Sequence, residues 1–152
     1  MARTLSEKAL AQGLKRPTLI ALADTIEGSR KDYYQALADS NRSMDVSAWL
    51  NYFGKTIIAA QNRTLSRMEF IIEKRKFYER FHERLNQRQS KVISRLFKEG
   101  VDGFQGGLSA ENYTSITKAP RATVTRDLSD LVKKEALVKT GKLKFTRYYL
   151  NI

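Results

Sequence analysis

The sequence predicts a mainly α-helical chain that forms two bodies and ends in a β-hairpin. Between Val46 and Ile72, apolar residues recur at steps of three to five, as they do along amphipathic helices. From Leu85 a second set of helical patterns begins, and a glycine-rich link at residues 103–107 interrupts it. Two β-prone runs around Gly141 close the chain. We therefore expect one helical body over residues 1–80 and a second over residues 84–152.

Composition excludes several classes of protein. Of the 152 residues 41% are hydrophobic, which is enough for a core, and none is a cysteine. A disulfide scaffold, a thiol nucleophile and a zinc finger are therefore excluded. The apolar runs are too short to span a membrane and the first residues do not resemble a secretion signal. We expect a cytoplasmic protein with no membrane partner.

The charge of the chain favours a polyanionic partner. Its 28 Lys and Arg against 16 Asp and Glu give a net charge of +12. Residues 84–152 hold 14 basic and 6 acidic residues, a net charge of +8, which makes this part the more basic one. Clustered cations attract phosphates and release condensed counterions on binding. Basic surfaces also occur on proteins that only need solubility, so charge alone leaves both explanations open.

The first body is expected to hold three helices. A short helix ends at Gly13, and a buried or extended connection follows at residues 19–23. A second helix is predicted for residues 26–41. A third, with Asp45 as its N-cap, is predicted for residues 46–78 and would be about 50 Å long.

The charged run at residues 73–80 and the single histidine are both expected to be exposed. We interpret the run, EKRKFYER, as a solvated helix end where the long helix leaves the first body. His82 has no Asp, Ser or Cys at a motif spacing, which favours a surface helix residue over a catalytic one.

The second body is expected to contain three helices and a hairpin. The first helix is amphipathic and stops near Gly100, and its apolar residues are Val92, Ile93, Leu96 and Phe97. Leu108 and Ser109 resemble a hydrophobic staple and an N-cap for a short helix through residue 117. Pro120 suits the first turn of the last helix. The hairpin is predicted from residues 137–139 and 143–150.

This order of elements resembles a winged helix-turn-helix, a fold of many bacterial regulators. The resemblance covers residues 84–152 and includes the phrase APRATVTRDLSDLVKKEALVKTG. It implies that the last helix enters the major groove of DNA and that the hairpin, the wing, approaches phosphates. The candidate nucleic-acid-binding residues are Arg121, Thr123, Thr125 and Arg126 on the helix and Lys142, Lys144 and Arg147 on the wing.

Another function for the same module is protein binding. Small winged helices also serve as homodimerisation or protein-docking modules, and Asp127 and Asp130 oppose a phosphate-binding surface. Thr123 also fits a local role, as a cap or a hydrogen bond within the helix.

The first body resembles the C-terminal part of a Fic-family domain. The segments MARTLSEKAL at residues 1–10 and RKDYYQALADSN at residues 30–41 carry the resemblance. Fic proteins transfer AMP from ATP to a hydroxyl of a target protein through the motif H-P-F-x-D/E-G-N-G-R-x-x-R. Here Arg3 matches the last arginine of that motif, and the preceding residues of the motif are missing. The resemblance implies a parent adenylyltransferase that uses ATP and Mg2+, and a chain that is inactive alone and binds neither cofactor by itself.

The resemblance also assigns nucleotide-binding residues. Arg3 would contact phosphates, and Tyr34 and Asn41 would line an adenine pocket from one side of a helix. Without the resemblance, Tyr34 fits a half-buried helix aromatic and Asn41 a helix terminator. We predict no catalytic residue and no metal ligand in the chain itself.

Overall fold

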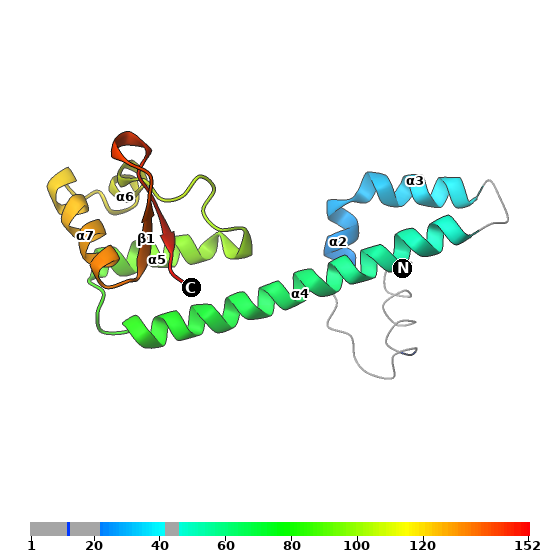
Figure 1. Ribbon diagram of the computed structural model, residues 1–152, viewed down its shortest axis with the longest axis horizontal. Helices are drawn as coiled ribbons and strands as arrows, with labels where there is room; N and C mark the ends of the chain where they lie inside the picture. Colours follow the sequence, from blue (N-terminus) through cyan, green and yellow to red (C-terminus); the bar gives the residue numbers. More distant parts are fainter. Residues whose placement is uncertain (1–11, 13–21, 42–45) are drawn as a thin grey trace. The chain divides into compact units, whose positions relative to one another are not determined.

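The structure is a computed structural model that describes residue 12 and residues 22–41 and 46–152 (Figure 1). These residues are mainly helical and end in a two-stranded antiparallel sheet, so the predicted mainly α class is confirmed. Among them, no helix is both long and apolar enough to cross a membrane. The helices are α2 (Leu22–Gly28), α3 (Arg30–Ser40), α4 (Ser47–Phe81), α5 (Gln87–Lys98), α6 (Ala110–Thr117) and α7 (Arg121–Lys133), and the strands are β1 (Leu137–Thr140) and β2 (Arg147–Leu150).

The chain divides into two compact units within α4, between Met68 and Glu69. In the first unit, Leu22 and Ile26 of α2 are buried together with Ala60 of α4. Asp24 of α2 accepts a hydrogen bond from Arg67 of α4 at 2.8 Å. The first unit thus has a small apolar core with an ion pair at its surface.

The single helix predicted for residues 26–41 is wrong, because Ser29 separates α2 from α3. Its hydroxyl donates to the carbonyl of Thr25 at 3.1 Å, and its backbone N–H donates to the carbonyl of Ile26 at 3.2 Å. Gly28 precedes the break, and a glycine followed by a serine that bonds locally weakens a helix. Leu22 is already helical, so the connection predicted for residues 19–23 is wrong at that residue. The predicted helix up to Gly13 and the predicted cap Asp45 lie outside the described residues apart from residue 12, which is helical.

The end of α4, which includes the charged run, contributes aromatic residues to the core of the second unit. Phe77 and Phe81 lie four residues apart on one helix face and are 3% and 0% exposed. Their rings are 4.6 Å apart between centroids, while Arg75 and Lys76 are exposed. The interpretation of residues 73–80 as a solvated helix end is therefore wrong for its aromatic residues. His82 is exposed in the turn just after the helix.

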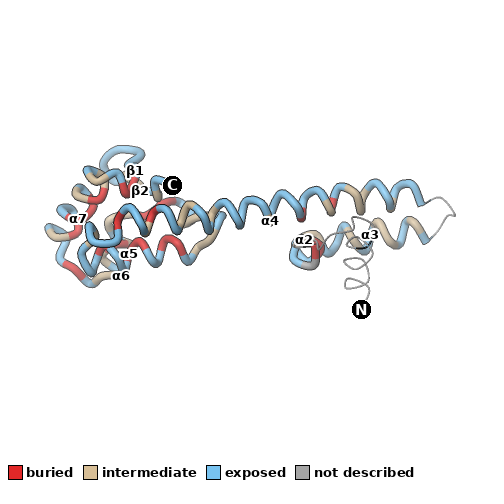
Figure 2. Tube along the Cα trace, turned by 90° about the horizontal axis from the view of Figure 1, so that it is seen from below, coloured by how far each residue is buried: buried red, intermediate tan, exposed pale blue. Residues whose placement is uncertain are grey.

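The core of the second unit forms where its helices and the hairpin meet. Figure 2 shows buried residues on the facing sides of these elements. The predicted apolar residues of α5 are all buried, which confirms that helix. Asn86 is its N-cap, in a capping box with Gln89. The buried residues of the core are Phe77, Phe81, Val92, Ile93, Leu96, Phe97, Leu108, Tyr113, Ala119, Val124, Leu128, Leu131, Ala136 and Leu137.

The hairpin is shorter than predicted on its second strand. The ladder runs from the pair Leu137 and Leu150 to the pair Thr140 and Arg147. Leu143–Phe145 forms a 3-10 helix, so the strand predicted for residues 143–150 is wrong over its first half. Leu108 adds a bridge to β2, because its N–H and carbonyl both bond with Tyr148 at 2.9 Å. This bridge ties the start of α6 to the hairpin.

Candidate nucleic-acid interface

The last helix, α7, separates its apolar and polar residues onto opposite faces. Val124, Leu128 and Leu131 are buried. Of its two acidic residues, Asp127 has a buried side chain and Asp130 has a side chain that is 42% exposed. Arg126 is exposed beside a stripe that follows the helix at steps of four residues, formed by Arg121, Thr125, Ser129 and Lys133.

The first carboxylate of α7, Asp127, is bound inside the unit. Arg88 donates to it twice, from Nε to Oδ2 at 2.8 Å and from Nη2 to Oδ1 at 3.2 Å. The hydroxyl of Tyr113 donates to Oδ2 at 3.0 Å, and Nδ2 of Asn86 donates to Oδ1 at 3.1 Å. Because its side chain is only 8% exposed, this carboxylate adds little negative charge to the outer face of α7.

The second carboxylate, Asp130, is also paired. Its Oδ2 accepts hydrogen bonds from Nε2 of Gln89 at 2.8 Å and from Nζ of Lys134 at 2.5 Å. Lys134 also donates to the carbonyl of Arg84 at 2.7 Å. The two aspartates therefore hold α7 against α5, and the opposition to a phosphate surface that the sequence suggested is largely neutralised.

The pKa values of both aspartates reflect these partners. Burial works against ionisation of Asp127, but the hydrogen bonds from Arg88, Asn86 and Tyr113 outweigh it and lower its pKa. Hydrogen bonds from Lys134 and Gln89 lower the pKa of Asp130. Burial and the hydrogen bond to Asp127 raise the pKa of the Tyr113 hydroxyl. Both carboxylates are thus charged, and the phenol is neutral, at pH 7.

The turn between α6 and α7 is fixed by local backbone geometry. Ser109 is the N-cap of α6, in a capping box with Asn112, which confirms the predicted cap. Lys118 ends α6 in the left-handed conformation at φ 59°, and its N–H donates to the carbonyl of Thr114 at 2.7 Å. Pro120 is the N-cap of α7, one position before its expected place in the first turn. Residues 118–120 therefore form a short connection that places the first turn of α7 next to the end of α6.

A polar groove joins α6, the first residue of α7 and the turn of the hairpin. Its volume is about 650 Å³. Three of the seven candidate residues of the sequence analysis border it, namely Arg121, Lys144 and Arg147. The other lining residues are Ser109, Ala110, Glu111, Thr114, Ser115, Leu143, Thr146 and Tyr148. The groove brings cations from α7 and the hairpin to one surface, where Glu111 of α6 also lies.

The remaining candidate residues on α7 and the hairpin differ in how accessible their polar groups are. Arg126 and Lys142 are exposed. Thr125 is exposed too, but its hydroxyl donates to the carbonyl of Arg121 at 3.0 Å. Thr123 is half-buried. The cations are therefore better placed than the threonines for contact with a polyanion.

The turn of the hairpin is closed by its own backbone. The N–H of Phe145 donates to the carbonyl of Lys142 at 3.0 Å, and the N–H of Thr146 donates to the carbonyl of Leu143 at 3.2 Å. Arg147 donates from Nη1 to the carbonyls of Lys144 and Thr146, at 3.2 and 2.8 Å. All of these hydrogen bonds lie within residues 142–147, so the turn is closed locally.

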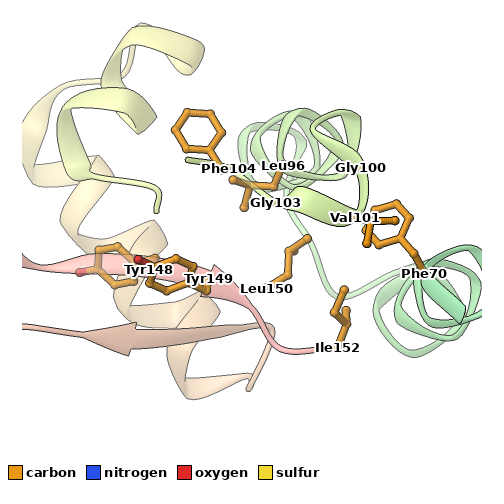
Figure 3. Close-up of a pocket in the computed structure, with 10 residues that line it drawn as sticks. All are labelled: Phe70, Leu96, Gly100, Val101, Gly103, Phe104, Tyr148, Tyr149, Leu150 and Ile152. Atoms are coloured by element: carbon orange, nitrogen blue, oxygen red, sulfur yellow. The ribbon is translucent and has the colours of Figure 1, made fainter. Parts of the chain in front are cut away.

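A smaller apolar hollow lies elsewhere on the second unit. Its volume is about 170 Å³, and it lies among side chains of α4, α5, the following loop and β2 (Figure 3). Its lining contains no charged residue, so it differs in chemistry from the polar groove. The lining residues are Phe70, Leu96, Gly100, Val101, Gly103, Phe104, Tyr148, Tyr149, Leu150 and Ile152.

Of the three candidate nucleotide-binding residues, the structure describes Tyr34 and Asn41. Arg3 lies outside the described residues. The ring of Tyr34 is 52% exposed and has the guanidinium of Arg30 5.7 Å from its centroid. Asn41 is exposed and caps α3, with its backbone N–H donating to the carbonyl of Leu37 at 3.1 Å. Asn41 therefore has the helix-terminating role that the sequence also allowed.

Sequence reasoning missed the residues that shape this interface. Arg88 and Gln89 reach α7 from a helix about forty residues earlier, and no short motif signals such pairs. Leu143 and Phe145 fall within the β-prone run after Gly141, which predicts a strand, but they form a 3-10 turn.

Comparisons with known proteins add no family to these observations. No protein-family model matches the chain, and no curated protein matches it either.

Proposed function

We propose that residues 84–152 form a winged helix-turn-helix that binds duplex DNA through α7 and the wing. The observation that carries the proposal is the exposed face of α7, which has cations at Arg121, Arg126 and Lys133, while Asp127 is buried and Asp130 is paired with Lys134 and Gln89. The helix order α5, α6, α7, followed by a hairpin, supports the fold. The groove that joins Arg121 to wing cations supports a single binding surface.

In this proposal the two elements contact different parts of DNA. The first turns of α7 enter the major groove, where Arg121 and Arg126 reach base edges or flanking phosphates. A guanidinium pairs with guanine through two hydrogen bonds, which gives some sequence preference. Lys142, Lys144 and Arg147 contact phosphates and orient the module.

A salt titration of duplex binding tests the proposal. We expect the intact chain to bind a mixed-sequence duplex of about 20 base pairs at low salt, with an affinity that falls steeply as salt rises. Arg121→Ala/Arg126→Ala should weaken binding and reduce the slope of log K against log salt by about two. The matched control is Lys91→Ala/Arg75→Ala, which removes the same charge from exposed residues on α5 and α4. No binding at low salt, or equal effects of both variants, would overturn the proposal.

The alternative function is homodimerisation or docking to a protein. Homodimerisation predicts a dimer in light scattering, and docking to another protein predicts a monomer. Both predict no affinity for duplex DNA. The same titration therefore separates the two functions. A cytoplasmic location is part of the DNA-binding proposal.

The Fic resemblance of the first body supports a separate proposal about origin. We infer that residues 1–80 derive from an adenylyltransferase domain that uses ATP and Mg2+ and whose catalytic loop precedes Arg3. Residues 30–40, which carry part of the resemblance, form helix α3. An in-frame H-P-F-x-D/E-G-N-G-R upstream of Met1 in the genome would support this origin, and its absence would remove the main reason for it.

A further inference from the structure

Two large apolar side chains, those of Leu143 and Phe145, are exposed at the tip of the wing. Leu143 is 93% exposed and Phe145 is 68% exposed. Exposed apolar residues are common one at a time, but Leu143 also adopts φ 52°, in the left-handed region. Leucine is strained there, whereas glycine or asparagine is not. Leucine at position 143 therefore does not stabilise the turn.

The turn holds these side chains in a defined position. The 3-10 hydrogen bonds of the tip close it from Lys142 to Thr146. Gly141, at φ +72°, is required because a Cβ there would lie 2.3 Å from the carbonyl oxygen of Phe145. Nζ of Lys144 lies 5.2 Å from the centroid of the Phe145 ring. The tip therefore has a defined backbone conformation that holds the two apolar side chains at its end.

The charges around the tip identify the partner. Residues 136–152 contain four cations, Lys139, Lys142, Lys144 and Arg147, and no Asp or Glu. An apolar tip surrounded by cations fits a partner with anionic groups outside and apolar surface inside. Duplex DNA has this arrangement, because phosphates flank the grooves and base pairs stack between them.

We propose that Leu143 and Phe145 form a wedge that enters the minor groove and partly unstacks one base step, so that the protein bends DNA. The inference rests on the proposed function, because the groove shared by Arg121, Lys144 and Arg147 places the wing beside the α7 surface. Apolar wedges of this kind kink duplexes by about 20–90° toward the major groove. An anionic membrane has related chemistry, but the shared groove favours DNA.

The test measures bending separately from binding. A duplex with a fluorophore at each end reports bending by energy transfer, and a salt titration reports phosphate contacts. The wedge variant is Leu143→Asn/Phe145→Ser, which keeps a residue that accepts φ 52° at the tip. We expect it to abolish the bend and weaken binding about tenfold, with an unchanged salt slope. Val138→Thr, a change at an apolar strand residue that is 44% exposed, is the matched control and should bend DNA as the natural chain does.

Each outcome decides between the proposals. A natural chain that binds DNA without bending it, or a wedge variant that bends it equally, overturns the wedge and leaves duplex binding intact. A natural chain that binds no duplex overturns both. Binding to vesicles of phosphatidylglycerol and phosphatidylcholine that the wedge variant loses, without DNA bending, also overturns the wedge and assigns the tip to a membrane surface. Circular dichroism and urea unfolding establish that the variants are folded.

Discussion

Arg88 and Asp127 form a bidentate ion pair between the start of α5 and the middle of α7, with N–O distances of 2.8 and 3.2 Å. The pair is asymmetric, because the carboxylate is 8% exposed and the guanidinium 45%. Arg88 therefore remains solvated on one side while it supplies the charge that the buried Asp127 requires. The consequence for function is that α7 is fixed to α5 by its negative charges and presents its positive charges outward.

Removal of Asp127 tests whether this network holds the second unit together. Asp127→Ala leaves the Tyr113 hydroxyl and Arg88 without their acceptor, and we expect it to lower the free energy of unfolding by about 2–4 kcal/mol. Asp102→Ala, at an exposed acidic residue of the same unit, should change it by less than about 0.5 kcal/mol. Urea unfolding of the intact chain at pH 7 measures both. Similar effects of the two changes would contradict the role of the network.

Acid should destabilise the second unit through the same carboxylates. Asp127 and Asp130 have pKa values below the ordinary 3.8, so they bind protons more weakly in the folded than in the unfolded chain. Their stabilising contribution is complete above about pH 5 and is lost as the pH falls through the lowered pKa values. We expect Asp127→Asn/Asp130→Asn to be less stable at pH 7 and to lose less stability between pH 5 and 2. Thermal unfolding across that range measures it, with Asp102→Asn as the control, and an unchanged pH dependence in the double variant would refute the assignment.

Much of the second unit follows from apolar spacing. The buried residues of α5 and α7 recur at helical steps, and the Leu108 and Ser109 pattern correctly marks the start of α6. Such local patterns are readable because one helix face must be buried. The ion pair of Arg88 with Asp127 is not readable in this way, because its partners are 39 residues apart.

Two errors have a common physical cause, which is that tertiary context overrides local character. Phe77 and Phe81 are separated by charged residues that suggest a solvated helix, yet the core of the second unit buries one side of that helix. Residues 143–146 are β-prone, but the register that pairs Thr140 with Arg147 leaves them outside the ladder. Propensity describes a residue's own preference and does not fix its pairing partner.

The burial of Phe81 predicts that the end of α4 stabilises the second unit. Phe81→Ala removes a fully buried ring and should cost about 3–5 kcal/mol. Ile71→Ala, at a residue of α4 that is 64% exposed, should cost less than about 0.5 kcal/mol. Hydrogen exchange of amides in α5 and α7 shows where the stability is lost. If these amides keep their protection in Phe81→Ala, the helix end is not part of that cooperative unit.

Gly106 and Gly107 provide a matched test of how closely the glycine-rich link approaches the hairpin. Both have positive φ, 71° and 72°, but only at Gly107 would a Cβ meet other atoms, with Cζ of Tyr149 at 2.7 Å and Cβ of Arg147 at 2.9 Å. Gly106→Ala carries backbone strain alone, about 1 kcal/mol. Gly107→Ala adds a steric conflict with β2 and should cost about 1–3 kcal/mol more, measured by urea unfolding.

The extra cost arises because Gly107 immediately precedes the Leu108 bridge to Tyr148, where the backbone cannot move away without losing two hydrogen bonds at 2.9 Å. Equal costs for the two substitutions would mean that the link does not pack against the hairpin in solution.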